Sequence, residues 1–211
     1  MKPAAPIRVL GRRTSLNVQK VMWYAAEIGV DVDRVDIGGA FGGNDTSEYL
    51  AKNPNGLVPT MEDGELVLWE SQAIVRYLAE RYGAVPWYPA SVENRARANQ
   101  WMDWYQTTLH APMTTVFWQL IRTAAEDQNP EAIDKAVALA ASHFAKLDDH
   151  LGDRDYLLGD QPSMADIPVG CSAYRWFNLD VTRPAMPKLE AWFDRLIARP
   201  GYQDHVVMEL T

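Results

Sequence analysis

A valine-proline pair in the first third of the chain has the residue types needed to bind a small extended molecule. Val58-Pro59 lies within residues 56–61, which otherwise have the pattern of a β-strand, and proline lacks the backbone donor that a strand uses. A cis bond at this place would direct the N–H and C=O of Val58 away from the sheet, where a peptide-like ligand could pair with them. Because cis bonds are uncommon even before proline, the residues alone favour a trans proline at a sheet edge.

Glu70-Ser71 forms a second candidate binding element. The pair falls where a predicted strand ends and a helix begins, so the Ser71 hydroxyl and N–H could bind a carboxylate while Glu70 binds an ammonium group. Together they could hold an amino-acid head group. The alternative is that Ser71 only caps the helix, which is the commoner role of serine at such a position.

Three cations flank the first predicted strand-to-helix turn. Arg12, Arg13 and Lys20 lie near the positive end of a helix dipole, which would suit an anion. Solvated side chains are an equally good interpretation, because Arg and Lys are usually exposed.

Metal and thiol chemistry are disfavoured. The single cysteine, Cys171, cannot form an internal disulfide or a Cys-x-x-Cys motif, and we expect a reducing, cytoplasmic compartment. The histidines lack metal-ligand spacing, so no metal site is expected. They are His110, His143, His150 and His205.

The elements that must position these residues follow from periodicity. A strand at 7–11, a helix through 18–29 and an alternating strand at 30–37 predict a parallel βαβ unit. Strands at 56–61 and 66–69 flank Asp63-Gly64, which predicts an antiparallel hairpin. A helix then runs from Ser71 to near Gly83.

A linker is expected at 83–91, where two prolines and a glycine interrupt both periodicities. Residues 1–82 should form one domain and 92–211 a second, all-helical one. Its helical patterns cover 92–124, 130–151, 163–177 and 187–199. Ser163 and Asp166 fit a capping box at the start of the third.

Composition excludes several classes of protein. With 47% apolar residues among 211, the chain can bury a sizeable core. Lys and Arg number 20 against 28 Asp and Glu, giving a net charge of −8, which disfavours nucleic acid as a partner. No apolar run approaches the length of a membrane span, so no membrane partner is expected.

Three segments carry a family resemblance. Residues 11–21 (GRRTSLNVQKV), 53–60 (NPNGLVPT) and 68–78 (LWESQAIVRYL) resemble the N-terminal signatures of soluble bacterial glutathione transferases, and the likeness continues through 163–167 and 198–202. The resemblance implies a thioredoxin-like N-terminal domain, a C-terminal helical-bundle domain and a homodimer. It also implies glutathione as a substrate, with no other cofactor.

The resemblance assigns roles to the two pairs. Val58 would bond the cysteinyl part of glutathione through its backbone, Pro59 would be cis, and Glu70 with Ser71 would hold the γ-glutamyl end. The hydroxyl that faces the glutathione sulfur in serine-type relatives corresponds to Ser15, with Asn17 as the rival.

Recognition of the glycyl carboxylate departs from the family pattern. Asn44 stands where related enzymes have histidine, and the cations of the first turn could compensate. On the helical side, the candidate wall of the electrophile pocket is the stripe of His110, Met113 and Phe117, which recur at three- and four-residue steps on one long helix. Residues of these types at this spacing are more often core, as we expect for Trp101, Trp104 and Trp118.

The leading hypothesis is a glutathione transferase that activates the tripeptide thiol for attack on a small electrophile. A second possibility uses the same thiolate as a reductant or for dehalogenation. A third is a non-catalytic glutathione-binding or protein-interaction module, because fold does not fix function.

Overall fold

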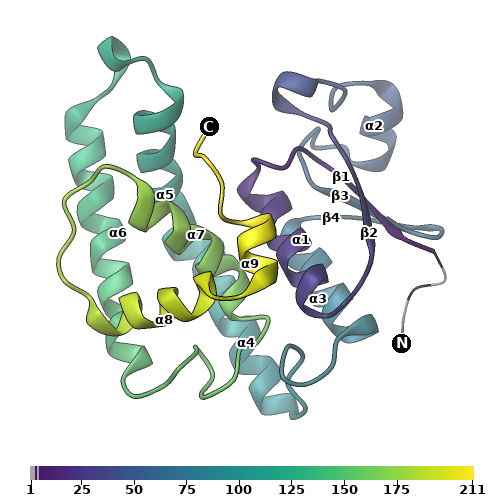
Figure 1. Ribbon diagram of the computed structural model, residues 1–211. Coiled ribbons are helices and arrows are strands. Elements are labelled where there is room, and N and C mark those ends of the chain that lie inside the picture. The colour runs from purple at the N-terminus through teal and green to yellow at the C-terminus, as the bar shows by residue number, and fades with distance from the viewer. Residues whose placement is uncertain (1–2, 4) are drawn as a thin grey trace.

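A mixed four-stranded sheet forms the centre of the first part of the molecule. The computed structural model describes residue 3 and residues 5–211 (Figure 1). The sheet has the order β2-β1-β3-β4. β1 is parallel to β2, and β3 is antiparallel to both β1 and β4. The strands are β1 Ile7–Leu10, β2 Val32–Val35, β3 Thr60–Asp63 and β4 Leu66–Trp69. The predicted βαβ unit and hairpin are both present.

Helices α1 (Leu16–Glu27) and α3 (Ser71–Tyr82) pack against each other beside this sheet. The short helices η1 (Gly39–Phe41) and α2 (Ser47–Lys52) lie in the crossing from β2 to β3. α3 ends where predicted, but Gly83 is not left-handed (φ −70°). Its Cβ would lie 2.5 Å from the Ala79 carbonyl oxygen, so glycine is needed there for space.

The strand prediction for 56–61 is partly wrong. β3 begins only at Thr60, so Val58-Pro59 lies in the loop before it. The Val58-Pro59 peptide bond is cis, as the family resemblance implied and against the trans form that the residues alone favoured. Proline cannot donate to the ladder, which explains why the strand starts after it.

The second part of the molecule consists of helices joined by loops. The predicted helix 92–124 is a continuous rod over 92–122 that contains two π-helical segments, η2 and η3. It comprises α4 Val92–Trp104, η2 Tyr105–Leu109, α5 His110–Phe117 and η3 Trp118–Arg122. The remaining elements are η4 Ala125–Asp127, α6 Pro130–Leu151, α7 Asp166–Asn178, α8 Pro187–Ile197 and α9 Pro200–His205. None of the helices described is long and apolar enough to cross a membrane.

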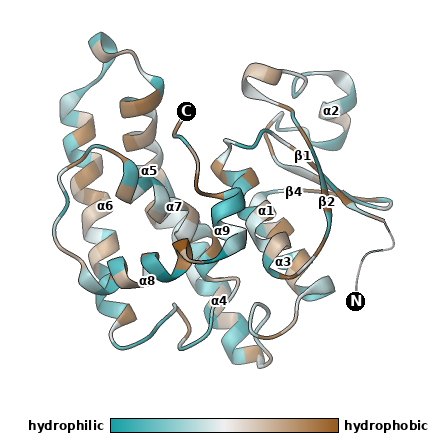
Figure 2. Ribbon diagram, in the orientation of Figure 1, coloured by the Kyte–Doolittle hydropathy of each residue, from teal (hydrophilic) through white to brown (hydrophobic). Residues whose placement is uncertain are grey.

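A buried carboxylate fixes the start of α7. Asp166 is fully buried and accepts hydrogen bonds from the N–H groups of Leu157 and Ser163 and from the Trp192 indole, at 2.9–3.0 Å. The predicted Ser163–Asp166 capping box is therefore present, and it also reaches α8. Figure 2 shows that the helices mix hydrophilic and hydrophobic residues, as expected of helices with one face in a core.

Helix α1 lies between the sheet and the helical part (Figure 1). It contacts α3 on one side and α7 and α9 on another. The Trp23 and Tyr202 rings meet edge to face at 4.7 Å between centroids, and Arg199 forms a bidentate ion pair with Glu27 at 2.7 Å. α1 is consequently shared by both parts of the molecule.

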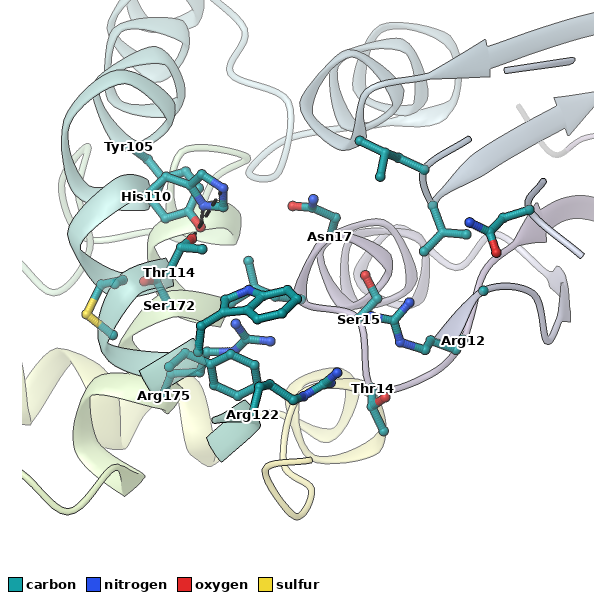
Figure 3. Close-up of a pocket in the computed structure, with 18 of the residues that line it drawn as sticks. Arg12, Thr14, Ser15, Asn17, Tyr105, His110, Thr114, Arg122, Ser172 and Arg175 are labelled. Atoms are coloured by element: carbon teal, nitrogen blue, oxygen red, sulfur yellow. Dashed lines mark hydrogen bonds between the residues drawn. The ribbon is translucent and has the colours of Figure 1, made fainter. Parts of the chain in front are cut away.

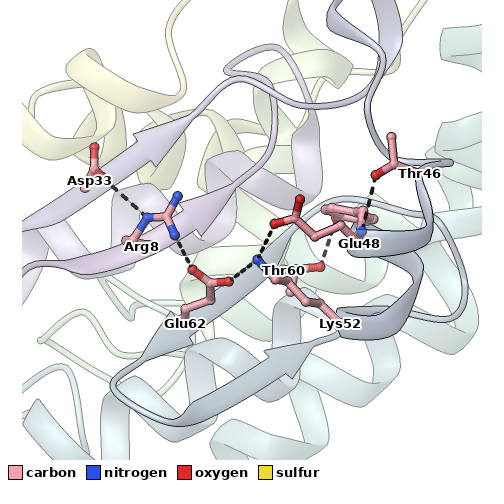
Figure 4. A network of polar contacts seen from close by, with 8 residues as sticks. Arg8, Asp33, Thr46, Glu48, Lys52, Thr60 and Glu62 are labelled. Carbon is pink, nitrogen blue, oxygen red and sulfur yellow. Dashed lines mark hydrogen bonds and ion pairs between the residues drawn. The ribbon is translucent and has the colours of Figure 1, made fainter.

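A chain of ion pairs ties α2 to the sheet (Figure 4). Glu62 on β3 accepts from Arg8 on β1 at 2.6 Å and from Lys52 on α2 at 2.8 Å. Lys52 also contacts Glu48, and Arg8 contacts Asp33 on β2. Exposed pairs contribute little individually, but this network fixes α2 beside the loop that contains Val58.

Candidate glutathione and acceptor site

A cavity of about 380 Å³ lies between the turn that precedes α1 and the helical rod (Figure 3). Seven predicted site residues line it: Ser15, Asn17, Asn44, Val58, His110, Met113 and Phe117. A second hollow of about 40 Å³ is lined by the other three, Pro59, Glu70 and Ser71. Because Asn17, Leu57 and Val58 line both, all the predicted residues belong to one continuous region.

Ser15 is the N-cap residue of α1 and is 9% exposed. Its backbone is extended, yet its hydroxyl makes no capping hydrogen bond. At the N-caps of α4 and α6, in contrast, the side chains of Ser91 and Asn129 accept from their own helices. The Ser15 hydroxyl is therefore uncommitted at the positive end of a helix dipole, where a bound anion is stabilised.

Asn17 connects the two hollows. Its Oδ1 accepts from Lys20 Nζ at 2.9 Å and from Ser71 Oγ at 3.4 Å. A lysine ammonium can only donate, so the amide oxygen must face Lys20 and the amide NH₂ points elsewhere. Figure 3 shows the Asn17 side chain projecting from α1 into the space opposite His110. The free NH₂ is a donor available to a ligand.

Lys20 is fully buried, which the sequence analysis did not anticipate. Its ammonium group lies 4.4 Å from the centroid of the Tyr105 ring, so it is held by a cation–π contact as well as by Asn17. Burial lowers the pKa of Lys20 to about 7, with Arg175 acting in the same direction. The three cations of the first turn therefore do not form one cluster. Lys20 is buried, Arg13 donates to the Asp204 carbonyl, and Arg12 lines the cavity.

The backbone of Val58 is free to pair with a ligand. Tyr49 Oη and Asn53 Nδ2 both donate to the Leu57 carbonyl at 2.7 Å, which fixes the peptide that precedes Val58. Within residues 5–211, neither the N–H nor the C=O of Val58 has a hydrogen-bond partner. This loop therefore presents one donor and one acceptor at the rim of the cavity.

Glu70 has a strained backbone, with φ at +70°. No other non-glycine residue among those described has a positive φ, and such strain is concentrated at functional sites. Ser71 is the first residue of α3 and not its N-cap, a position held by Glu70 without any side-chain capping bond. The alternative interpretation of Ser71 as a helix cap is thus wrong, and its hydroxyl meets Asn17 instead.

Two family models match the chain: the glutathione S-transferase N-terminal domain over residues 5–80 and the C-terminal domain over 130–195. The chain belongs to the glutathione S-transferase family. This confirms the resemblance and the expected fold, a thioredoxin-like domain followed by a helical one.

Relatives from bacteria resemble this glutathione S-transferase over most of its length. Glutathione S-transferase GstB of Escherichia coli (strain K12) is 36% identical over 97% of this chain and 100% of its own. The theta class glutathione S-transferase of Xanthomonas axonopodis pv. citri with glutathione bound is 45% identical, with a TM-score of 0.94 over 98% of this chain and 100% of that one. Dichloromethane dehalogenase of Methylorubrum extorquens is 32% identical over 70% of this chain and 56% of its own.

On the thioredoxin-like side of this glutathione S-transferase, Asn44 is partly engaged within the protein. Its Nδ2 donates to the Gly56 carbonyl at 2.7 Å, which leaves one N–H for a ligand. Arg12 lies over Gly38 and Gly39, so closely that a Cβ at Gly39 would come within 2.9 Å of Arg12 Cδ. The glycines allow the Arg12 guanidinium to reach the cavity.

The helical wall carries a buried polar chain. His110 Nδ1 pairs with Tyr105 Oη at 3.0 Å, and His110 Nε2 lies 3.5 Å from Thr114 Oγ1. Burial, aided by Lys20 and Arg175, lowers the pKa of His110 to about 4, so the ring is neutral at pH 7. Met113 and Phe117 are only 2% and 3% exposed and contribute their edges to the wall.

Three residues of the helical wall were not predicted as site residues from the sequence. Trp118 was expected in the core, but it is 57% exposed and lines the cavity. Arg122 and Arg175 also line the cavity. No spacing rule marks them, since they come from η3 and α7 and meet only in the fold.

Proposed function

We propose that this protein transfers glutathione to a small electrophile by stabilising the glutathione thiolate at Ser15. In the reaction the thiolate sulfur forms a bond to carbon while the bond to the leaving group breaks; the thiol proton goes to solvent and the leaving group departs with the electron pair. In an addition, the attacked molecule takes up the proton instead. The observation that carries this proposal is the uncommitted Ser15 hydroxyl at the start of α1, inside the cavity.

Glutathione would extend along the loop that precedes β3. The free N–H and C=O of Val58 would pair with its cysteinyl residue, and the cis Pro59 sets the direction of this peptide. Glu70 would bind the γ-glutamyl ammonium and Ser71 the γ-glutamyl carboxylate. Asn44, through its remaining N–H, would contact the glycyl carboxylate.

Stabilisation of the thiolate needs only moderate energies. Lowering the pKa of a thiol from about 8.5 by about two units amounts to about 2.7 kcal/mol. One hydroxyl hydrogen bond to the anion supplies about 1.5 to 3 kcal/mol. The dipole of α1 adds about 0.3 to 1 kcal/mol, and the Asn17 NH₂ is a second donor within reach. The reaction therefore requires no cofactor beyond its glutathione substrate.

The electrophile would occupy the half of the cavity that faces the helical rod, against His110, Met113 and Phe117. His110 is neutral at pH 7, so it offers a polar but uncharged surface. Its ring nitrogens are already paired with Tyr105 and Thr114, which suits a role in shaping the pocket more than one in proton transfer.

Assembly and location are part of the same proposal. We propose a cytoplasmic homodimer, with the chain divided into domains at 1–82 and 92–211 and a linker at 83–91. Exposed apolar residues on the edge strand β4, Leu66, Val67 and Trp69, support a partner at that edge. Light scattering at micromolar concentration should give twice the 23.8 kDa chain mass, and a particle of one chain mass would contradict the dimer.

The test of the thiolate role is a titration of bound glutathione. The ultraviolet absorbance of the thiolate, followed against pH, should show a higher thiol pKa in Ser15→Ala than in wild type, by about one to two pH units. Turnover of 1-chloro-2,4-dinitrobenzene should fall in parallel, with little change in glutathione affinity. If Asn17→Ala moves the titration and Ser15→Ala does not, the roles of the two residues are reversed.

Ser91→Ala is the matched control. Ser91 is also a helix N-cap, but its side chain accepts from Asn94 N–H at 3.1 Å, outside the cavity. Its loss should cost about 0.5 to 2 kcal/mol of stability and leave the thiolate titration unchanged. Ser15→Ala should do the opposite, because its hydroxyl caps nothing.

The two other functional classes are separated by the same measurements. Glutathione binding without turnover across a panel of aryl halides, haloalkanes and activated alkenes would favour a non-catalytic module. Turnover confined to haloalkanes, with release of halide, would favour a dehalogenase, which uses the same thiolate. The absence of cysteine from residues 12–18 disfavours mixed-disulfide reduction on the protein.

A further inference from the structure

The acceptor half of the cavity is cationic, although the chain as a whole carries a net charge of −8. Arg12, Arg122 and Arg175 line the cavity, and none of its described lining residues is Asp or Glu. Figure 3 shows Arg122 and Arg175 together on the helical wall, with Arg12 across from them beside Ser15. The residues that line the cavity therefore offer no side-chain carboxylate to the three arginines.

Arg175 is the most unusual of the three. It comes from α7 and is partly buried, and its side chain makes no ion pair and no hydrogen bond among the residues described. Its guanidinium carbon lies 3.6 Å from the centroid of the Phe117 ring, and the residue lines the cavity, so its N–H groups are within reach of a ligand there. A partly buried charge that has no partner in the protein is a ready binding group for an anion.

The groups that face Arg175 do not compensate its charge. Burial lowers the pKa of Arg175 to about 10, and the charges of Arg122 and Arg12 lower it as well. The groups that raise it are the Tyr105 hydroxyl and the Cys171 thiol. Burial raises the pKa of Cys171 to about 12 and that of Tyr105 well above its ordinary value. Both are un-ionised at pH 7, so Arg175 faces no anion of the protein.

Arg122 is held in place on the same wall of the cavity. It donates to the backbone oxygen of Thr211 and lies 5.5 Å from the Phe117 centroid. Ser172, one helical turn before Arg175 on α7, also lines the cavity. Its hydroxyl is buried and has no hydrogen-bond partner among the residues described. Two guanidinium groups and one unpartnered hydroxyl thus converge on the acceptor half of the site.

We propose that the acceptor electrophile carries a carboxylate or an equivalent oxyanion, which Arg175 and Arg122 bind on the helical wall. This inference rests on the proposed function and names the substrate class of that site. Planar guanidinium groups bind a carboxylate through paired hydrogen bonds, and the edge of the Phe117 ring would border the rest of the electrophile. In the proposed binding mode glutathione does not supply this anion, because its two carboxylates are assigned to Ser71 and to Asn44 on the opposite wall.

The test compares two acceptors that differ only in charge, 4-chloro-3-nitrobenzoate and 4-chloro-3-nitrobenzamide. The kcat/KM of each is divided by its uncatalysed rate constant with glutathione, which removes their difference in intrinsic reactivity. Wild type should prefer the benzoate by about tenfold or more. Arg175→Gln should lower that preference about ten- to a hundredfold, and Arg122→Gln by a smaller factor.

Two further variants guard the interpretation. Arg175→Lys keeps the charge but loses the fork, so it should retain part of the preference, and it replaces the Gln variant if that one fails to fold. Arg97→Gln removes an exposed arginine of α4 outside the cavity and should leave the preference unchanged. A wild-type preference near unity overturns the proposal, as does a preference that persists in both Arg175 variants.

Other outcomes separate this inference from the proposed function. Arg175→Gln could instead shift the thiolate titration, or weaken glutathione binding and lower kcat/KM equally for both acceptors. In either case the arginines serve glutathione and the inference fails. If wild type turns over neither acceptor, the proposed function fails, and calorimetric binding of the two glutathione conjugates decides the inference. Tighter binding of the carboxylate conjugate by about tenfold supports it, and equal binding overturns it.

Discussion

Replacement of Lys20 by methionine tests the most unusual charge in the structure. Methionine has a similar length and is apolar, so Lys20→Met fills the same space without the ammonium group. Lys20 is fully buried, and its pKa falls from the ordinary 10.5 to about 7. At about 1.4 kcal/mol for each pH unit, the protonated form costs the folded state about 5 kcal/mol relative to the unfolded state.

The sign of the pH dependence follows from these two values. Between about pH 7 and 10.5 the unfolded chain holds a proton at Lys20 that the folded chain has lost, so the free energy of unfolding contributed by this group rises with pH. Below pH 7 both states are protonated and the full penalty remains. The advantage of Lys20→Met over wild type should therefore be greatest below pH 7 and should fall by up to about 5 kcal/mol as the pH approaches 10.

Urea unfolding of wild type and Lys20→Met at a series of pH values measures this difference directly. Most other titrating groups cancel in the subtraction, because both proteins contain them. His110, whose pKa of about 4 is lowered in part by Lys20, titrates below the pH range of the comparison. Lys146→Met, on the exposed surface of α6, controls for the loss of one lysine from the chain. A stability difference between Lys20→Met and wild type that stays constant from pH 6 to pH 10 would refute the interpretation of Lys20 as a destabilised buried cation.

Three further substitutions test the site and its supports. Ser71→Ala should weaken glutathione binding about ten- to a hundredfold in calorimetry and should affect the binding of Cys-Gly little. The melting temperature should not change, because Ser71 is not a helix cap. A lower melting temperature with an unchanged ratio of the two ligand affinities would contradict the role of Ser71 in binding the γ-glutamyl group. Asp166→Asn places an NH₂ group against donors and should cost about 3 to 5 kcal/mol in urea unfolding, and a loss below about 1 kcal/mol would show that this carboxylate is not needed. Gly170→Ala should cost about 1 to 3 kcal/mol, since its Cβ would come within 2.8 Å of Leu196 Cδ1 and 2.9 Å of the Trp23 ring; a neutral effect on the melting temperature would mean that α7 moves freely away from α1.

Local patterns were sufficient to predict most of the fold. The helix at 130–151 was predicted with the bounds that the structure has, because its apolar face repeats over six turns between a capping asparagine and a glycine. The hairpin 60–69 followed from a turn signal between two alternating runs. The resemblance, and not the pattern, gave the cis form of Pro59 and the site residues around it.

The sequence could not predict features that depend on contacts between distant segments. Lys20 has the sequence context of a solvated cation, and only the packing of Tyr105 against α1 buries it. Trp118 has the sequence context of a core residue, and only the fold shows that it lines the cavity. Arg122 and Arg175 lie far apart in the chain, so no spacing signals that they share a wall.

The position of α1 between two packed layers has a consequence for where the site is rigid. Nine of the residues in this helix are buried, and they face α3 on one side and α7 and α9 on another. Local opening of α1 would have to break both contacts at once, so its amide protons are released only with extensive unfolding. Ser15 and Asn17 thus stand on a preorganised support, and in the proposed binding mode the conformational entropy lost on glutathione binding would fall on the loops around Asn44 and Val58 instead.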